Sequence, residues 1–258
     1  MTTLDEITPL LLSFSQEEKE KILSQAEKYD QLLTKLPKVA DFAKETEKLD
    51  AGILALNGAS GAGQSYVMKR VENLLKERSL KLPRIYLLGT RDVRPDEDHK
   101  APYIFVKENE KGFQDIHNAD IFYPRTEIYY RYQSRPGADN AILLADMQTA
   151  TQEKMYLETV IPTLLHLKEN EIAGIPAWGD RMRIAYLAAP SGNEWVFRLL
   201  NREPERLSEA KYRATLLGRF SSSLSDMEIA AEKKIVCVLN HFGLAEQAAA
   251  EILQVWGV

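Results

Sequence analysis

The sequence has little cysteine, no excess of positive charge and no long apolar run. Cys237 is the one cysteine in 258 residues, so no disulfide can form within the chain, and its apolar surroundings favour a buried small side chain over a redox role. The net charge of −5 gives no overall attraction to duplex nucleic acid or to an anionic membrane. No apolar run approaches the about 20 residues of a membrane span. The start lacks the basic segment of a secretory signal, so we expect a reducing, cytoplasmic location.

The first fifty residues contain no glycine and are predicted to be helical. Ser15 and Glu18 fit a capping box, and Pro37 suits the first turn of a second helix, which predicts helices over 15–36 and 37–48 in an extension over 1–50. Apolar residues recur at alternating spacings of four and three at Ile22, Ala26, Tyr29, Leu33, Leu36, Ala40 and Ala43. This stripe has two interpretations: the extension packs on the core, or it forms a homodimer.

From Ala51 onward, short apolar runs alternate with amphipathic stretches. This alternation is typical of an α/β fold in which helices flank a central parallel sheet, and it predicts one domain over 51–258. The predicted strands are 53–56, 84–88, 141–145, 183–188 and 235–239. The predicted helices are 65–78, 151–168, 193–201, 208–233 and 244–255.

The segment between the first of these strands and the first helix is Asn57-Gly-Ala-Ser-Gly-Ala-Gly-Gln-Ser65. It fits the phosphate-binding motif G-x-x-x-x-G-K-[ST] except that Gln64 replaces the lysine. Its glycines let successive N–H groups and the helix N-terminus point at an anion. Ser65 can supply a hydroxyl to Mg²⁺ between two phosphates of ATP. The alternative is a glycine-rich turn that binds nothing.

Four further groups of motifs follow this loop along the chain. They are Gly89-Thr-Arg-Asp-Val-Arg94 with Tyr103-Ile-Phe-Val106; Tyr129-Tyr130; Ile142-Leu-Leu-Ala-Asp-Met-Gln148; and Ile184–Ser191 with Arg198–Arg202 and Glu209–Arg213. In this order they resemble motifs of the guanylate kinase family: T-T-R-x-x-R with Y-x-F-V, Y-Y-G, I-L-D-I-D-x-Q-G, and P-P-S with R-L-x-x-R and a later arginine. The loop is similar to the family's GPSGAGKS, and the resemblance covers about Ala51 to the C-terminus.

The resemblance implies a P-loop kinase fold with an inserted mixed α+β region that binds a nucleoside monophosphate (NMP) over 89–140 and a helical lid over 201–213. It implies ATP as co-substrate, Mg²⁺ as cofactor and nucleotides as partners. The implied ATP-binding residues are Gly58, Ser60, Gly61, Ala62, Gly63, Gln64, Ser65 and Asn240. The implied NMP-binding residues are Arg91, Arg94, Tyr103, Asp120, Tyr130 and Asp146. The implied residues for phosphoryl transfer are Gln64, Arg198, Arg202 and Arg213, and those for the metal are Ser65 and Asp146.

The sequence departs from the family in the pocket for the base as well as at Gln64. The family's serine before its T-T-R falls at Leu87 or Leu88, its glutamate near Asp120 or Ile121, and its serine after Y-Y-G at Tyr132. A site built for one hydrogen-bonding pattern rejects others strongly, so the base can be guanine or another.

Three functions follow as hypotheses. The first is a kinase that transfers the γ-phosphoryl group of ATP to an NMP, slowed on the order of 10²–10³-fold by Gln64 if no other cation replaces the lysine. The second is a weak or inactive module of the same fold that binds a nucleotide or a phosphorylated partner, which Gln64 would suit. The third, suggested by the altered base pocket, is a kinase acting on a modified base within a nucleotide or polynucleotide.

Overall fold

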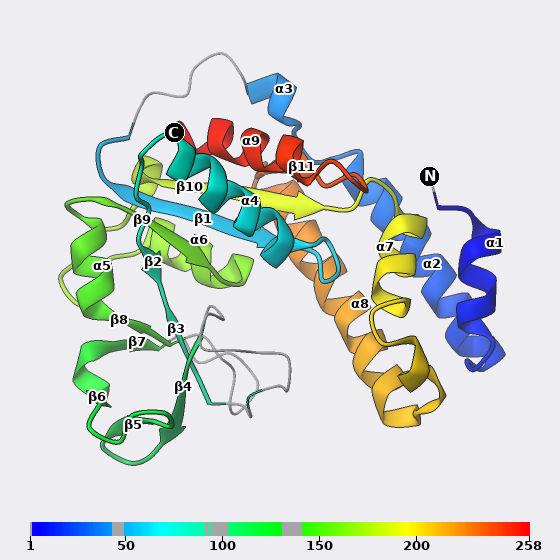
Figure 1. Ribbon diagram of the computed structural model, residues 1–258, viewed down its shortest axis with the longest axis horizontal. Coiled ribbons are helices and arrows are strands. Elements are labelled where there is room, and N and C mark those ends of the chain that lie inside the picture. The colour runs from blue at the N-terminus through cyan, green and yellow to red at the C-terminus, as the bar shows by residue number, and fades with distance from the viewer. Residues whose placement is uncertain (1, 43–48, 91–92, 94–102, 131–140) are drawn as a thin grey trace. The chain divides into compact units, whose positions relative to one another are not determined.

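The computed structural model describes residues 2–42, 49–90, 93, 103–130 and 141–258 (Figure 1). The chain divides into two compact units. The first unit comprises Met1–Glu47, Asn57–Leu80 and Ile184–Val258, and the second comprises Lys48–Leu56 and Lys81–Arg183. The N-terminal residues therefore belong to the same compact unit as the glycine-rich loop and the C-terminal helices.

Helices make up most of the first unit. Its elements are α1 (Leu4–Ile7), η1 (Thr8–Leu11), α2 (Gln16–Leu33), α3 (Val39–Phe42), the end of β1 (Gly52–Gly58), α4 (Gln64–Glu77), most of β10 (Met182–Ala188), α7 (Gly192–Leu200), η4 (Pro204–Ser208), α8 (Ala210–Glu232), β11 (Val236–Leu239) and α9 (Ala245–Trp256). The five helices predicted over 15–36, 65–78, 193–201, 208–233 and 244–255 are confirmed within three residues at each end. Of the helix predicted over 37–48, α3 is described, and residues 43–48 lie outside the described part.

Helix α2 begins as its sequence predicts and buries its apolar stripe within the chain. The N–H of Glu18 donates to Ser15 Oγ at 3.2 Å, and the N–H of Ser15 donates to Glu18 Oε2 at 2.7 Å. The buried residues of α2 are Ile22, Ala26, Tyr29, Leu32 and Leu33. This face contacts α7 and α8, which lie beside α2 (Figure 1). The first interpretation of the stripe, packing on the core, is thus confirmed, and a homodimer through it stays a prediction without support.

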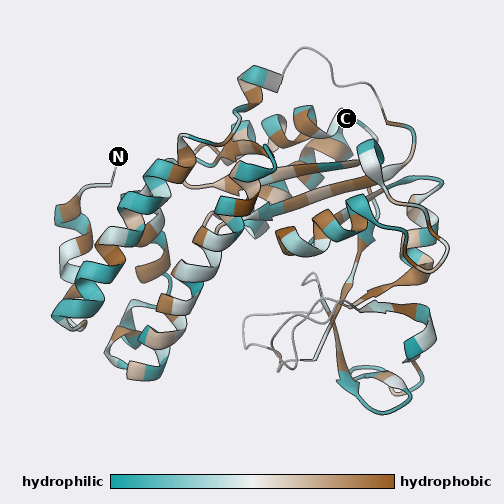
Figure 2. Cartoon of the chain, turned by 180° about the vertical axis from the view of Figure 1, so that it is seen from behind, coloured by the Kyte–Doolittle hydropathy of each residue, from teal (hydrophilic) through white to brown (hydrophobic). Residues whose placement is uncertain are grey.

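The central sheet has five strands in the order β11-β10-β1-β9-β2, where β9 is Lys154–Glu158 and β2 is Arg84–Ile85. The pairs β10–β11, β1–β9 and β2–β9 are all parallel. Buried parallel strands are expected to be almost continuously apolar, and the sheet is mostly brown in Figure 2, whereas α2 carries both colours. The predicted α/β fold, a parallel sheet flanked by helices, is confirmed.

Three of the predicted elements are wrong. The predicted strand over 84–88 is broken at Tyr86 into two short strands that belong to different sheets. The predicted strand over 141–145 is β8 (Ala141–Leu143) followed at once by α5 (Leu144–Ala150), and β8 pairs antiparallel with β3 (Leu87–Gly89) in a second sheet. The predicted helix over 151–168 contains β9 and only then α6 (Ile161–Glu169). Short apolar runs such as Met155-Tyr-Leu157 fit a buried strand and a buried helix equally well, which is why periodicity did not separate them.

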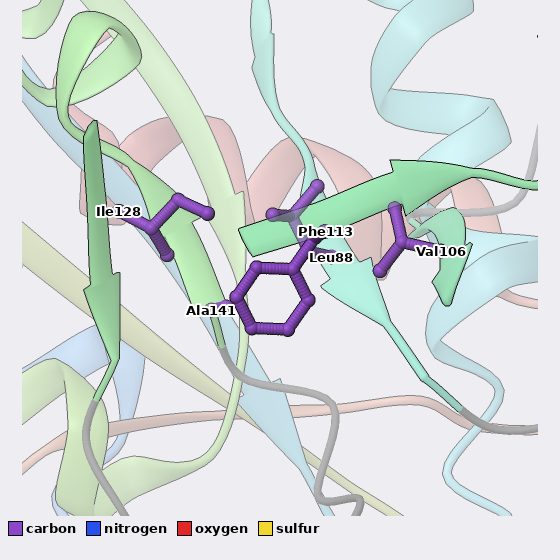
Figure 3. Packing of buried hydrophobic residues seen from close by; sticks show 5 residues of the cluster. All are labelled: Leu88, Val106, Phe113, Ile128 and Ala141. Carbon is purple, nitrogen blue, oxygen red and sulfur yellow. The ribbon is translucent and has the colours of Figure 1, made fainter. Parts of the chain in front are cut away.

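The second unit also holds the described part of the inserted region, which forms a six-stranded sheet in the order β6-β5-β4-β3-β8-β7. The further elements of this unit are β4 (Tyr103–Glu108), β5 (Gly112–Asp115), β6 (Phe122–Pro124), η2 (Arg125–Glu127), β7 (Ile128–Tyr130) and η3 (Gly179–Arg181). Strands β3 and β4 are parallel, and the other pairs are antiparallel. One side of the sheet packs into a small core, shown in Figure 3, of Leu88, Val106, Phe113, Ile128 and Ala141.

Candidate functional site

The glycine-rich loop joins β1 to α4, as the phosphate-binding motif requires. Gly61 and Gly63 have φ of +82° and +87°, which an L side chain rarely adopts. A Cβ on Gly63 would lie 2.7 Å from Asn240 Nδ2, and one on Gly58 would lie 2.4 Å from the carbonyl oxygen of Leu187. The chain therefore needs glycine at these positions both for its backbone conformation and for close packing.

Four backbone N–H groups of the loop and the following helix have no backbone acceptor among the described residues. Within the described part of the chain, no hydrogen bond to a backbone oxygen is present for the N–H groups of Gly61, Gly63, Gln64 and Ser65. Gln64 and Ser65 are the first two residues of α4, a helix of 14 residues, so the positive end of its dipole lies at the same place. This combination of unpaired donors and a helix N-terminus is an anion-binding arrangement.

The rest of the loop backbone is held by the surrounding first unit. The N–H of Ala59 donates to the Leu187 carbonyl at 3.1 Å, and the N–H of Ser60 donates to Ser223 Oγ at 3.0 Å. Asn240 Nδ2 donates to the Ala62 carbonyl at 2.7 Å. Asn240, assigned to the ATP site by resemblance, thus acts directly on the shape of the loop.

Arg198 also binds this part of the loop. Its guanidinium donates to the Asn240 carbonyl at 2.8 Å, to the Ala62 carbonyl at 3.5 Å and to Glu194 Oε1 at 3.0 Å. Burial raises the pKa of Glu194, but hydrogen bonds from Thr2 and Arg198 outweigh that effect and lower the pKa. The carboxylate therefore stays ionised beside Arg198, and this arginine is engaged in holding the loop backbone.

The other two arginines predicted to act on the phosphoryl group differ in their contacts. Arg213, in the first turn of α8, donates to the carbonyls of Leu207 and Ser208 at 3.1 and 3.0 Å. Its Nε also lies 3.5 Å from Glu18 Oε1 of α2. Arg202 is exposed in the segment between α7 and η4. Of the three arginines, Arg202 is the one whose guanidinium makes no hydrogen bond to the described residues.

The second unit contains the residues predicted for the NMP. Tyr103 on β4 is half-buried and pairs with Leu87 of β3. Its ring lies against Gly89, where a Cβ would be in van der Waals contact with it. Asp120 is exposed in the turn before β6, where its N–H donates to Asn118 Oδ1 at 3.0 Å. Arg91, Arg94 and the side chain of Tyr130 lie outside the described residues.

The predicted base pocket is partly a core in the structure. Leu87 and Leu88 are each 1% exposed, and Leu88 belongs to the core of the second sheet (Figure 3). Tyr132 lies outside the described residues. Neither leucine position therefore offers a surface on which a base could be recognised.

The sequence predicted that Asp146 ends a strand of the parallel sheet, and this prediction is wrong. It lies in the first turn of α5, which follows the antiparallel strand β8. Burial raises its pKa, and a hydrogen bond from the N–H of Tyr86 acts in the opposite direction. Because Tyr86 separates β2 from β3, this carboxyl ties α5 to the break between those two strands. A role of Asp146 with a metal or an NMP stays a prediction.

Glu158 occupies the position that sequence reasoning gave to Asp146. It ends β9 and pairs in register with Leu56 of β1, the residue before Asn57. The Tyr156 hydroxyl donates to Glu158 Oε2 at 2.6 Å, and the Arg84 guanidinium lies 4.9 Å from the Tyr156 ring centroid. Ligands of parallel sheets bind at the carboxyl ends of strands. Pro162 in the first turn of α6 was the sequence signal that could have separated this strand from the helix.

The residues at the loop fit a magnesium–nucleotide complex better than an isolated metal. Among the described residues, no group of three or more His, Cys, Asp or Glu side chains could hold a metal ion. Mg²⁺ commonly takes only one or two protein ligands together with phosphate oxygens and waters. Ser65 is exposed at the start of α4, where its hydroxyl is accessible to such a complex.

Two other predictions can be compared with the structure. Cys237 is 1% exposed, and burial raises the pKa of its thiol to about 12, so the predicted buried side chain is confirmed. Among the described residues, no helix combines the length and the apolar character that crossing a membrane requires.

Comparisons with known proteins find similarity among solved structures alone. No family model matches the sequence, and no curated protein matches it. Among solved structures, the chain is similar to the crystal structure of guanylate kinase from Anaplasma phagocytophilum. The identity is 12%, the match covers 81% of this chain and 86% of that chain, and the TM-score is 0.48. Because both the identity and the TM-score are low, the similarity carries no statement about activity.

Proposed function

We propose that the protein is an ATP-dependent nucleoside-monophosphate kinase of the guanylate kinase type. The observation that carries the proposal is the loop between β1 and α4. Its glycines at positive φ and its unpaired N–H groups at a helix N-terminus form a cradle for phosphates. The motif order along the chain supports an acceptor site as well as a donor site.

The donor nucleotide would be held by the loop. The N–H groups of Gly61, Gly63, Gln64 and Ser65 would bind its phosphate oxygens. Mg²⁺, held by the Ser65 hydroxyl and the phosphates, would supply charge neutralisation. The side chain of Gln64 can donate hydrogen bonds but brings no positive charge, and a neutral donor is worth about half a charge-assisted one.

The acceptor would be held by the resemblance-assigned residues Arg91, Arg94, Tyr103 and Tyr130. Guanidinium forks match the geometry of phosphate oxygens, so two arginines and phenol hydroxyls suit a dianionic phosphate. The carboxylate that the resemblance assigns to the acceptor and the metal is Asp146, in the first turn of α5.

Among the three arginines, we assign to Arg202 the role of stabilising the charge on the transferring phosphoryl group. Arg198 and Arg213 already donate to backbone carbonyls and contact Glu194 and Glu18. Using either of them for catalysis would leave a carboxylate and carbonyl oxygens without a partner. Arg202 is exposed and would contact a substrate without that cost.

One observation favours a second function. Gln64 removes the positive charge that phosphoryl transfer uses, and a module that only binds a nucleotide or a phosphorylated partner does not need that charge. Such a module would keep the fold and the arginines of the second unit but would turn over no ATP.

A panel of ribo- and deoxy-NMPs with MgATP tests the two functions, using the protein as it is and its Gln64→Lys variant. The kinase hypothesis predicts equal amounts of ADP and a nucleoside diphosphate with at least one NMP. It also predicts a rate at least about 10²-fold higher with lysine. Gln247→Lys adds the same charge on the exposed side of α9 and should leave the rate unchanged. No turnover with either protein would refute the kinase and favour the binding module.

A further inference from the structure

The N-terminal helix α2 is connected to the glycine-rich loop by contacts within the first unit. The first contact joins α2 to α7. The ring of Tyr29 stacks on that of Trp195 with centroids 4.5 Å apart and an interplanar angle of 19°. Both side chains are fully buried. The Tyr29 hydroxyl also donates to the carbonyl of Ala189 at 3.1 Å, which fixes the ring in its plane.

The second contact joins α7 to the loop. Trp195 Nε1 donates to the carbonyl of Ser60 at 2.9 Å, and Ser60 lies within the proposed phosphate cradle. The rings of Trp195 and Phe220 of α8 also form a T-shaped pair, with centroids 5.0 Å apart and an interplanar angle of 89°. The indole is thus held by aromatic neighbours on two helices, and its one hydrogen-bond donor is aimed at the loop backbone.

A parallel set of contacts fixes the N-terminus of α7. Asp30 Oδ1 accepts a hydrogen bond from the N–H of Gly192 at 2.7 Å. A Cβ on Gly192 would lie 2.1 Å from the carbonyl oxygen of Ala26, so the two helices touch backbone to backbone at this point. Thr2 donates to Glu194, whose carboxylate holds Arg198 against the carbonyl of Ala62. Residues of the N-terminal segment therefore set the direction of α7, and α7 sets two carbonyls of the loop.

We propose that the N-terminal segment is a positioning element of the nucleotide site, with Tyr29 acting through Trp195 and Asp30 through the N-terminus of α7. This inference rests on the proposed binding of a nucleotide at the loop. A loop binds phosphate through N–H groups whose directions depend on each peptide plane, and the carbonyl of Ser60 belongs to the peptide whose N–H is that of Gly61. Holding that carbonyl turns the Gly61 N–H toward the cradle.

The coupling is reciprocal by thermodynamic necessity, since two linked sites affect each other equally. If α2 and α7 hold the loop in its binding conformation, then MgATP at the loop must stabilise α2. A merely structural role of α2 would affect folding but would leave the Kd for MgATP of the folded variants unchanged, whereas a bound ligand stabilises any native protein.

The test uses the whole chain, with Trp195→Phe as the main variant and Tyr29→Phe as the second. Trp195→Phe keeps an aromatic ring but removes the donor to Ser60, and Tyr29→Phe keeps both rings but removes the bond to Ala189. Lys28→Ala is the control, because Lys28 lies on the same helix and, among the described residues, forms its salt bridge with Glu228 of α8, at 2.6 Å, with both side chains about half exposed. Thermal unfolding establishes that each variant is folded.

Two measurements are made on each protein: the Kd for MgATP by calorimetry and the hydrogen exchange of residues 16–33 with and without MgATP. We expect the Kd of Trp195→Phe to be about twofold to tenfold higher, which is the effect of losing one hydrogen bond. The Kd of Tyr29→Phe should also be higher. Lys28→Ala should bind as the unmodified protein does. MgATP should slow exchange in α2 of the unmodified protein and of Lys28→Ala, but less in Trp195→Phe.

The outcomes separate this inference from the proposed function. If the unmodified protein binds MgATP and both aromatic variants bind it equally well, the positioning role is refuted and the kinase proposal stands. Should Trp195→Phe fail to fold, Tyr29→Phe alone decides in the same way. If the unmodified protein binds no MgATP, both the proposed function and the positioning role are refuted.

Discussion

Replacing Gly63 by alanine is a direct test of the loop geometry. The residue has φ of +87°, and its new Cβ would lie 2.7 Å from Asn240 Nδ2. An L residue in the left-handed region costs about 1–2 kcal/mol. The Asn240 amide must also move and lose its 2.7 Å hydrogen bond to Ala62, at a cost of about 0.5–1.5 kcal/mol. The free energy of unfolding should therefore fall by about 1.5–3.5 kcal/mol.

Two other glycines of the first unit separate the two parts of this effect. Gly243 has φ of +77° but nothing within 4 Å of a built Cβ, so Gly243→Ala should cost only the backbone strain of about 1–2 kcal/mol. Gly218 lies inside α8, also with nothing within 4 Å. Gly218→Ala should therefore raise the free energy of unfolding by about 0.5–1 kcal/mol.

Urea unfolding followed by circular dichroism measures all three variants, and MgATP binding is measured on the same preparations. The expected order of stability is Gly218→Ala, the unmodified protein, Gly243→Ala and then Gly63→Ala, with MgATP binding weakened only in the last. If Gly63→Ala costs no more than Gly243→Ala, the close approach of Asn240 to the loop is refuted.

Two further predictions concern buried titratable groups. Burial raises the pKa of Asp226 on α8 from 3.8 to about 6. Its charge therefore destabilises the folded state above pH 6, by up to about 3 kcal/mol. This penalty shrinks as the pH falls through 6 toward 3.8. Asp226→Asn should therefore raise the free energy of unfolding at pH 8 in urea titrations but not at pH 4, and equal gains at both values would contradict the burial of its charge. Cys237 is buried with a thiol pKa raised to about 12, so it should react with a thiol reagent at pH 8 only after unfolding, and rapid labelling of the native protein would contradict its burial.

Local chemistry made the loop and most helices predictable. Gly61, Gly63 and Ser65 lie within a few residues of one another, and their roles depend on a backbone conformation that glycine alone adopts easily. The same holds for the start of α2, where Ser15 and Glu18 form their reciprocal hydrogen bonds over one turn. Signals of this kind are complete within a short window of sequence.

Features that depend on distant partners were missed or misplaced. Tyr156 and Leu157 are apolar neighbours that fit a helix as well as a strand, and only pairing with β1 and β2 makes them part of β9. Asp146 follows an apolar run that resembles a parallel strand but pairs antiparallel in the second sheet. Arg198 matched a motif for phosphoryl transfer, but its partners Asn240 and Ala62 are 42 and 136 residues away in the chain, beyond what spacing can show.

The central claim is that this fold transfers a phosphoryl group from ATP to an NMP. Phosphorus NMR of the protein with MgATP and each NMP in turn tests it most directly, because it identifies every phosphate product. We predict that ADP and one nucleoside diphosphate appear in equal amounts, faster with Gln64→Lys. Inorganic phosphate without a nucleoside diphosphate, or no change in any mixture with either protein, would contradict the account.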